Sequence, residues 1–150
     1  MNRNWRKDFQ LEPHPEGGMF KRIFLSENTV TRQSDSKSRA ALSQIYYSLK
    51  EGEVSRFHRI TSDEVWTLVD GGPLLLLLWN ESSEKLTEVV LNKDRGLFSG
   101  IVPAGTWQAA KPLGEEVLCT CSVGPGFDFE DYTMIEDEAE KFKKLKSIKI

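Results

Sequence analysis

Short runs of alternating hydrophobic and polar residues, separated by glycine, proline, asparagine and aspartate, occupy most of this chain. Alternation with a period of two is typical of a strand that is buried on one face. Regular turn signals between many short strands favour an all-β sandwich or barrel. The pattern predicts strands at residues 19–25, 41–49, 74–79, 86–91, 98–102, 106–110 and 116–123.

The run Leu74–Trp79 is hydrophobic at every position. Leucine favours helix by propensity, but the run is too short for a helix because turn-forming residues lie on both sides. A strand that is buried on both faces fits better. We therefore expect a turn at Asp70–Pro73, where two glycines precede a proline. Residues 28–38 are almost entirely polar and are expected to form a mobile loop.

The two ends of the chain have a helical period instead. Asn4–Gln10 predicts a short helical turn, with Trp5 and Phe9 packed inward. Hydrophobic residues recur at helical spacing between residues 135 and 148. We expect an amphipathic C-terminal helix there, packed on the exterior of the β structure or on a partner.

Length and composition are those of an ordinary globular protein. The chain has 150 residues, of which 39% are hydrophobic and 29% charged, and we expect one domain over residues 1–150. The net charge of −3 gives no basic excess for nucleic acid. The N-terminus lacks the apolar segment of a signal peptide, and no apolar run is long enough to cross a bilayer. These features predict a soluble, cytoplasmic protein that binds neither nucleic acid nor membrane.

The two cysteines, Cys119 and Cys121, lie two positions apart in a predicted strand. Both side chains then point to one face across extended backbone, which is a poor geometry for a disulfide. No second pair of cysteines is present to complete a tetrahedral metal site. We interpret both as small buried residues.

The strongest candidate chemistry lies between Gly52 and Gly71. His58, one of two histidines in the chain, is on a predicted strand, and Glu64 follows the turn at Thr61–Asp63. If the strands on either side of this turn pair as a hairpin, the imidazole and the carboxylate face the same interior. Such a pair can move a proton, because the carboxylate orients the imidazole and raises its basicity.

The spacing of Gly52, His58, Glu64 and Gly71 resembles the first motif of the cupin superfamily, with Ile60 in place of the second histidine. The second cupin motif resembles residues 96–108, where Pro103–Gly105 matches and Gln108 replaces the third histidine. One extra residue separates Gly96 from Pro103.

Further matches make the resemblance specific to the cupin subfamily known as DUF985 or cupin_5, over about residues 11–132, although Met19 stands where an aromatic residue is usual. The resemblance implies a single cupin double-stranded β-helix, a jelly-roll barrel, and a homodimer. The matching segments are residues 11–18, 57–59, 62–66, 102–107 and 125–129.

Among cupins, the chain is similar in architecture to the metal-independent nucleotide-sugar 3,5-epimerases, in which a histidine removes a proton α to a carbonyl and a tyrosine returns one. The resemblance implies an epimerase or isomerase for a small carbonyl compound such as a sugar derivative. His58 and Glu64 are then the candidate catalytic dyad, and Tyr46 the candidate proton donor. Asp63 or Asp131 are alternative partners of His58, and Tyr47 is an alternative donor.

Other side chains are candidates for ligand binding. Arg56 and Arg59 can bind an anionic group, and aromatic side chains can line a pocket at the mouth of a barrel. Trp66 shares the strand face of Glu64 and is the best candidate for such a pocket, with Trp107 and Gln108 beside it. The expected partner is therefore a small molecule.

Two alternatives stay open, a non-catalytic module that binds a small ligand and a degenerate metal-dependent cupin enzyme. A cupin metal would bind here through His58, Glu64 and Gln108, with His14 as a further candidate. Two strong ligands hold a first-row transition metal poorly, so we expect no metal cofactor. The turn that contains His14 and Glu16 is expected to have mainly a structural role.

Overall fold

The structure is a computed structural model that describes residues 3–138, 148 and 150. Its elements are α1 (Trp5–Asp8), β1 (Glu12–Pro13), β2 (Met19–Leu25), β3 (Thr29–Thr31), β4 (Ser38–Ala40), β5 (Ser43–Leu49), β6 (Ser55–Ile60), β7 (Asp63–Asn80), β8 (Lys85–Leu91), η1 (Lys93–Arg95), β9 (Ser99–Val102), β10 (Trp107–Gly124), η2 (Phe129–Asp131), β11 (Tyr132–Met134) and η3 (Ile135–Glu138).

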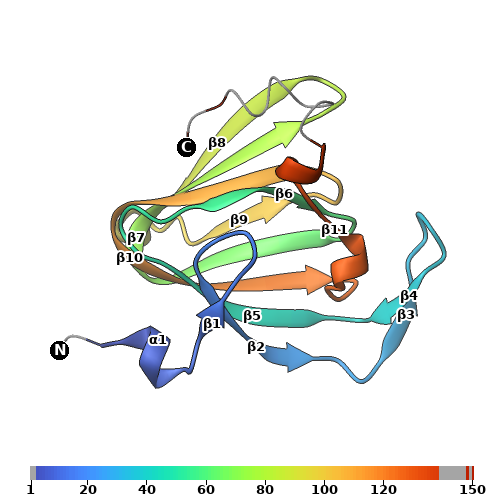
Figure 1. Cartoon of the computed structure of the whole chain (residues 1–150), viewed down its shortest axis with the longest axis horizontal. Helices are drawn as coiled ribbons and strands as arrows, with labels where there is room; N and C mark the ends of the chain where they lie inside the picture. The colour runs from blue at the N-terminus through green and yellow to red at the C-terminus, as the bar shows by residue number, and fades with distance from the viewer. Residues whose placement is uncertain (1–2, 139–147, 149) are drawn as a thin grey trace.

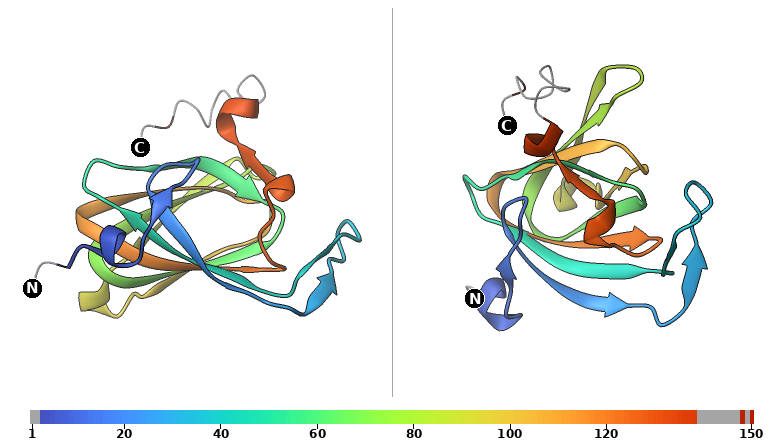
Figure 2. Two further views of the ribbon diagram at one scale, coloured as in Figure 1. Left: turned by 60° about the horizontal axis from the view of Figure 1, so that its bottom comes forward. Right: turned by 45° about the vertical axis from the view of Figure 1, so that its right-hand side comes forward.

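Nine of the described strands form one hydrogen-bonded sheet that curls into a barrel of two layers (Figure 1). The first half of β7 and the second half of β10 lie in one layer with β2, β5 and β9. Their other halves lie in the second layer with β6, β8 and β11. Figure 2 shows these layers, together with the segment from η2 to η3 that crosses one end of the barrel.

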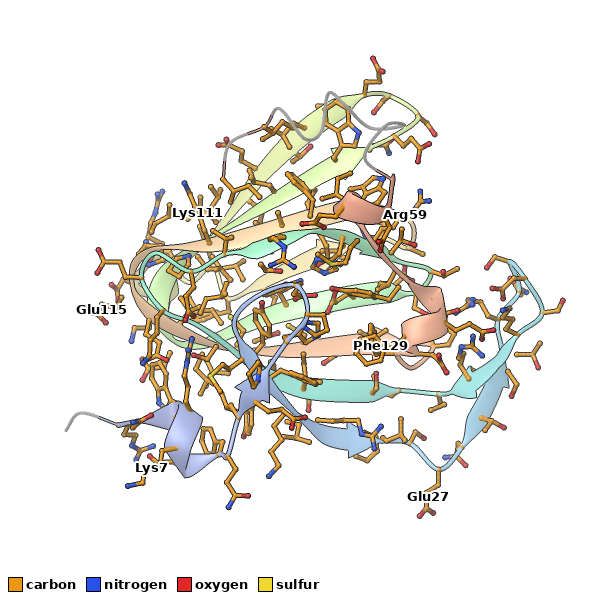
Figure 3. All side chains as sticks on the ribbon, viewed as in Figure 1. Lys7, Glu27, Arg59, Lys111, Glu115 and Phe129 are labelled. Carbon is orange, nitrogen blue, oxygen red and sulfur yellow. The ribbon has the colours of Figure 1, made fainter. Side chains whose placement is uncertain are left out.

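The bends of β7 and β10 correct two predictions from the sequence. Asp70–Pro73 is not a turn between strands, since β7 continues through it, and β10 joins the two short strands expected at 106–110 and 116–123. The register between β7 and β10 shifts at Pro112–Leu118, opposite the glycines of β7. In Figure 3, Lys111 and Glu115 lie at this bent end, and Arg59 and Phe129 lie at the opposite end.

The alternation of side chains produces two hydrophobic clusters, one on each side of the second layer. The interior cluster contains large buried side chains of both layers, such as Tyr47, Trp66 and Leu76. A second cluster lies on the outer face of β6, β7 and β10 and includes Trp107, against which Ile135 of η3 packs.

Other elements agree in part with the sequence. The predicted N-terminal turn is the helix α1. The loop expected at residues 28–38 is shorter in the structure, because it includes β3, which pairs with β4 on either side of residues 32–37 as a separate hairpin that projects from the barrel (Figure 1). The predicted C-terminal helix at 135–148 begins as the 3₁₀ turn η3, and most of it lies outside the described residues. Within the described part of the chain, no helix has the length and hydrophobicity needed to cross a membrane.

Gly71 provides a test of the bend. Its φ is 75°, and a Cβ atom added there would lie 1.8 Å from the carbonyl oxygen of Glu116. Gly105 is a matched control, because its φ is 80° but an added Cβ would meet nothing within 4 Å. We expect Gly105→Ala to lower the free energy of unfolding by about 1–2 kcal/mol, the cost of the left-handed backbone alone. Gly71→Ala must also displace β10 and should cost about 3–4 kcal/mol.

Denaturant unfolding of the two variants measures both losses. Equal losses of stability would contradict the close approach of β7 and β10 at Gly71.

Candidate functional site

A cavity of about 40 Å³ lies inside the barrel, which is room for a few water molecules or a small ligand group. Five of the side chains that line it carry an ionisable nitrogen or oxygen group. These are His14, Glu16, His58, Glu64 and Tyr132. The remaining wall is mainly hydrophobic and includes Phe20, Ile45, Ile60, Val123 and Phe127.

His58 and Glu64 both face this cavity, as the sequence predicted, but β6 and β7 do not form the expected hairpin. In the described sheet, β6 pairs with β10 and β11, and the first half of β7 pairs with β10 and β9. The short link at Thr61–Ser62 crosses from one layer to the other. His58 and Glu64 therefore enter the cavity from opposite walls of the barrel.

Glu16 enters the cavity from the turn between β1 and β2. The backbone N–H of His14 donates to Gly18 O at 3.0 Å, and the Gly17 N–H donates to His14 O at 3.0 Å, which closes the turn. The Arg56 N–H of β6 donates to Glu16 O at 2.8 Å, and the hydroxyl of Tyr47 donates to Gly17 O. This turn is thus held against the barrel wall with the Glu16 side chain buried.

The Glu16 carboxyl group is the centre of the polar cluster. Its Oε2 lies 3.2 Å from His58 Nε2 and 3.4 Å from His14 Nδ1. The hydroxyl of Tyr132 donates to the same oxygen at 3.2 Å, and that of Ser55 donates to Oε1 at 3.0 Å. The partner of His58 in this geometry is therefore Glu16, in addition to the predicted Glu64.

Burial controls the protonation of this cluster. It raises the pKa of Glu16 to about 7, although the hydrogen bonds from Ser55 and Tyr132 oppose the shift. Burial also lowers the pKa of His58, against the attraction of Glu64, and lowers that of His14 to about 3. Both imidazoles therefore stay neutral near pH 7, and Glu16 gains or loses its proton there.

The tautomer of His58 follows from its backbone contact. Its Nδ1 lies 2.7 Å from Arg56 O, which can only accept, so Nδ1 carries the ring proton of the neutral imidazole. The lone pair on Nε2 then points toward Glu16 Oε2. A single proton can move between these two atoms.

Glu64, on the wall opposite His58, has a separate set of contacts. The Gln108 Nε2 donates to Glu64 Oε1 at 2.7 Å, and the Trp66 indole N–H donates to Gln108 Oε1 at 2.8 Å. Burial raises the pKa of Glu64 to about 7, while the positive form of His58 would lower it. Gln108, whose Cα pairs with that of His58, thus reaches across the barrel interior to Glu64, and neither Trp66 nor Gln108 lines the cavity as predicted.

Tyr46, the predicted proton donor, is not in the cavity. Its ring stacks on Phe9 at 4.7 Å between centroids, on the outer face of the barrel. The alternation of β5 places the neighbouring Tyr47 inside instead, in contact with Trp66 and His14. The assignment of Tyr46 to the site is corrected for this reason.

The predicted ligand-binding residues Arg56, Arg59 and Trp107 also lie outside. Arg56 is half exposed and donates to Glu136 and to the backbone. Arg59 lies over the ring of Trp107 at 4.8 Å, in the cluster on the outer face of the second layer. Arg59 is next to His58 on β6, and Trp107 is next to Gln108 on β10, so the alternation of side chains directs both outward. Arg56 is two positions from His58, but its long side chain turns outward to Glu136.

Sequence reasoning missed Glu16 and Tyr132 as members of the site. For Glu16 the signal was present, since two prolines and two glycines fix the backbone of Pro13–Gly18 around two polar side chains. Tyr132 had no comparable signal, because it joins the cavity only through the pairing of β11 with β6.

The donor set does not fit a first-row metal ion. Ile60 offers no lone pair, and the Gln108 carbonyl oxygen is occupied by Trp66, so its amide N–H₂ faces Glu64. His14 Nδ1 accepts a hydrogen bond from the Glu16 N–H at 3.2 Å. Among the described residues, no group of three or more histidine, cysteine, aspartate or glutamate side chains is placed to hold a metal.

Comparisons with known proteins support the same architecture. The family model of the cupin superfamily called DUF985 matches residues 3–135. The uncharacterized protein YML079W of Saccharomyces cerevisiae is 29% identical over 149 residues, which cover 89% of this chain and 74% of the yeast protein.

Solved structures are similar over most of the chain. Protein SO0799 of Shewanella oneidensis is 32% identical with a TM-score of 0.79, over 91% of this chain and 85% of that chain. A hypothetical protein from Leishmania major is 25% identical with a TM-score of 0.79, over 94% of this chain and 93% of that chain. Bacillus subtilis oxalate decarboxylase, at 14% identity and a TM-score of 0.64 over 93% of this chain and 40% of that chain, shares the fold alone. These matches confirm the jelly-roll barrel expected from the sequence.

Removal of metal should leave the fold unchanged. Because the cavity is held together by hydrogen bonds among protein groups, the midpoint of thermal unfolding should be the same with and without EDTA. A lower midpoint in EDTA, restored by one equivalent of iron, manganese or nickel, would show that the cluster rearranges into a metal site.

The pH dependence of stability tests the protonation of Glu16. The folded pKa, about 7, is above the ordinary value of 4.5, so this group stabilises the fold fully below pH 4.5 and the contribution is lost as the pH rises through 7. Glu16→Gln cannot ionise, so it does not lose stability in this way. As the pH rises from 4.5 to 7, the free energy of unfolding of Glu16→Gln should therefore increase relative to that of the unaltered protein, by up to about 3 kcal/mol.

Glu53→Gln is the matched control. The ion pair with Arg6 lowers the pKa of Glu53, so its contribution is already complete above the ordinary pKa. The difference between this variant and the unaltered protein should stay constant over the window in which Glu16→Gln changes. A constant difference for Glu16→Gln as well would mean that Glu16 is ionised throughout.

Proposed function

The chain belongs to the DUF985 family of the cupin superfamily, and from the cavity of this barrel we propose that it is an isomerase or epimerase that moves a proton next to the carbonyl group of a small compound. The observation that carries the proposal is the 3.2 Å contact between Glu16 Oε2 and His58 Nε2 in a buried cavity. Proton abstraction α to a carbonyl needs a base with a pKa near the working pH, at a place from which water is largely excluded.

The Glu16–His58 dyad meets these requirements. His58 keeps its Nδ1 proton on Arg56 O and presents Nε2 as the base, and Glu16 stabilises the imidazolium that forms when Nε2 takes a proton. Tyr132 holds the Glu16 oxygen in place by its hydrogen bond and stacks on His58 with 5.5 Å between ring centroids. The dyad can act as a base only after the proton shared by Glu16 Oε2 and His58 Nε2 has been lost. Turnover should therefore rise with pH through the pKa of Glu16, about 7.

The position of the tyrosines favours return of the proton by the same dyad. Tyr46 is outside the barrel, and the Tyr47 hydroxyl is bound to Gly17 O. Tyr132 lies on the same side of the cavity as His58. A two-base epimerase needs a second proton donor on the opposite face of the substrate. Tyr46, the residue predicted for this role, cannot supply it. A single-base isomerisation, in which the proton moves between neighbouring carbons, agrees better with this arrangement.

Exchange of substrate hydrogen with deuterated water tests the proposal. Acetone, hydroxyacetone and glyceraldehyde are incubated with the protein in deuterated water, and proton NMR measures loss of the α-hydrogen signal. His58→Asn keeps a polar side chain but removes the titrating nitrogen, so exchange should fall by about 10²–10⁴-fold. Tyr46→Phe, on the outer face, should exchange at the rate of the unaltered protein.

Two results decide against this function. Absence of exchange with every compound in the panel would leave the chain without the proposed activity. If a compound binds without exchange and His58→Asn weakens its binding, His58 is a recognition residue, and the non-catalytic binding module replaces the enzyme. The homodimer expected from the sequence stays a prediction.

A further inference from the structure

Three side chains form a hydrogen-bonded chain that the Glu16–His58 dyad does not use. It runs from Trp66 in the hydrophobic core through Gln108 to Glu64 at the cavity wall, with distances of 2.8 and 2.7 Å. All three side chains are buried, with residual exposures of 1% for Trp66, 1% for Gln108 and 7% for Glu64. A buried polar chain of this kind fixes the orientation of every group in it.

Trp66 determines the direction in which the hydrogen bonds of this series run. An indole N–H can only donate, so the Gln108 oxygen must face Trp66 and its N–H₂ must face Glu64 Oε1. Glu64 Oε1 is therefore an acceptor. Because Glu64 also lines the cavity, its other oxygen, Oε2, is left for a molecule bound there.

The surroundings of Glu64 disfavour a negative charge. The other titratable groups that line the cavity are His14, Glu16, His58, Cys121 and Tyr132, and three of these five, Glu16, Cys121 and Tyr132, add negative charge when they ionise. Among the described residues that line the cavity, none is a lysine or arginine. Burial and the nearby Glu16 accordingly raise the pKa of Glu64 to about 7.

We propose that Glu64 is a neutral carboxylic acid whose Oε2–H donates a hydrogen bond to the carbonyl oxygen of the substrate, which limits the substrate class to uncharged carbonyl compounds. This inference rests on the proposed function and adds to it a second catalytic residue. An anionic carboxylate or phosphate would face Glu16 and Glu64 with no cation to balance it, and would be excluded.

The chemical step is balanced between the two walls of the cavity. His58 Nε2 takes the α-hydrogen as a proton, and the electron pair of the broken C–H bond forms the new C=C bond. The π pair of the C=O bond moves to oxygen, and the enolate oxygen that forms accepts the hydrogen bond of Glu64 Oε2–H, which keeps its proton. Glu64 thus stays neutral and accepts from Gln108, and return of the proton from His58 Nε2 to carbon completes the exchange or the isomerisation.

The first test measures the protonation of Glu64 directly. In protein labelled with ¹³C at the glutamate carboxyl carbon, the Glu64 resonance is identified by its loss in Glu64→Gln. We expect it to titrate with a midpoint near 7 rather than at the ordinary 4.5. A midpoint at the ordinary value would overturn the proposal, whatever the protein does with carbonyl compounds.

The second test uses acetone and acetate, which have nearly the same shape but differ in charge. At about pH 6, NMR titration should show at least ~10-fold tighter binding of acetone than of acetate to the unaltered protein, because only the neutral compound avoids an unbalanced buried charge. Equal binding, tighter binding of acetate or binding of neither would overturn the inferred substrate class.

The third test separates a donor from a base. In the unaltered protein, ionisation of Glu64 removes the donor, so exchange that has risen with ionisation of Glu16 should decline again above about pH 7. The Gln side chain of Glu64→Gln still donates but does not ionise, so this variant should lose less exchange of acetone than His58→Asn and should show no decline at high pH. A loss as large as that of His58→Asn would make Glu64 a base and overturn the proposal. Absence of exchange in the unaltered protein would reject the proposed function, whereas the titration and the acetone preference would still decide the state of Glu64.

Discussion

The barrel depends on two strands, β7 and β10, that each belong to both of its layers. Neither strand can do this without a bend, and the bends coincide where β7 carries Gly71 and Gly72 and the register of β10 shifts. A side chain at Gly71 would collide with the β10 backbone, so the close approach of the two strands requires glycine. The interior cavity exists because these strands curl the sheet back on itself.

Burial then determines the chemistry of the cavity. A charge that is moved from water into such a space loses its solvation, so each ionisable group shifts toward its neutral form. Glu16 and Glu64 respond by binding protons more tightly, and His14 and His58 by binding them less tightly. The pKa values of Glu16 and Glu64 are therefore both about 7, and groups that titrate near neutral pH are suited to acid–base chemistry.

The barrel by itself does not identify a reaction. Its fold is shared with oxalate decarboxylase at only 14% identity, so the scaffold alone does not define the reaction. Here Ile60 and Gln108 occupy two of the positions at which the cupin motifs have histidine. Gln108 is held by Trp66 in the orientation that supports Glu64, and the turn between β1 and β2 brings Glu16 to His58. Around the cavity, the described side chains are joined by a network of protein hydrogen bonds.

The sequence by itself determined the β-rich fold, most strand positions and which residues of a strand share a face, because a period of two along a strand depends only on local backbone geometry. It also pointed to the cupin family through short motifs at fixed spacing. Tertiary structure alone decided that Asp70–Pro73 lies within a bent strand and that Tyr46, Arg56, Arg59 and Trp107 face outward.

The contact of Glu16 with His58 was equally beyond the sequence, since it joins residues that are distant in the chain through a docked turn. The physical reason is the same in each case. Which face of a strand is the interior, and which turn covers it, depends on long-range pairing of β5, β6, β7 and β10, and no local pattern specifies that pairing.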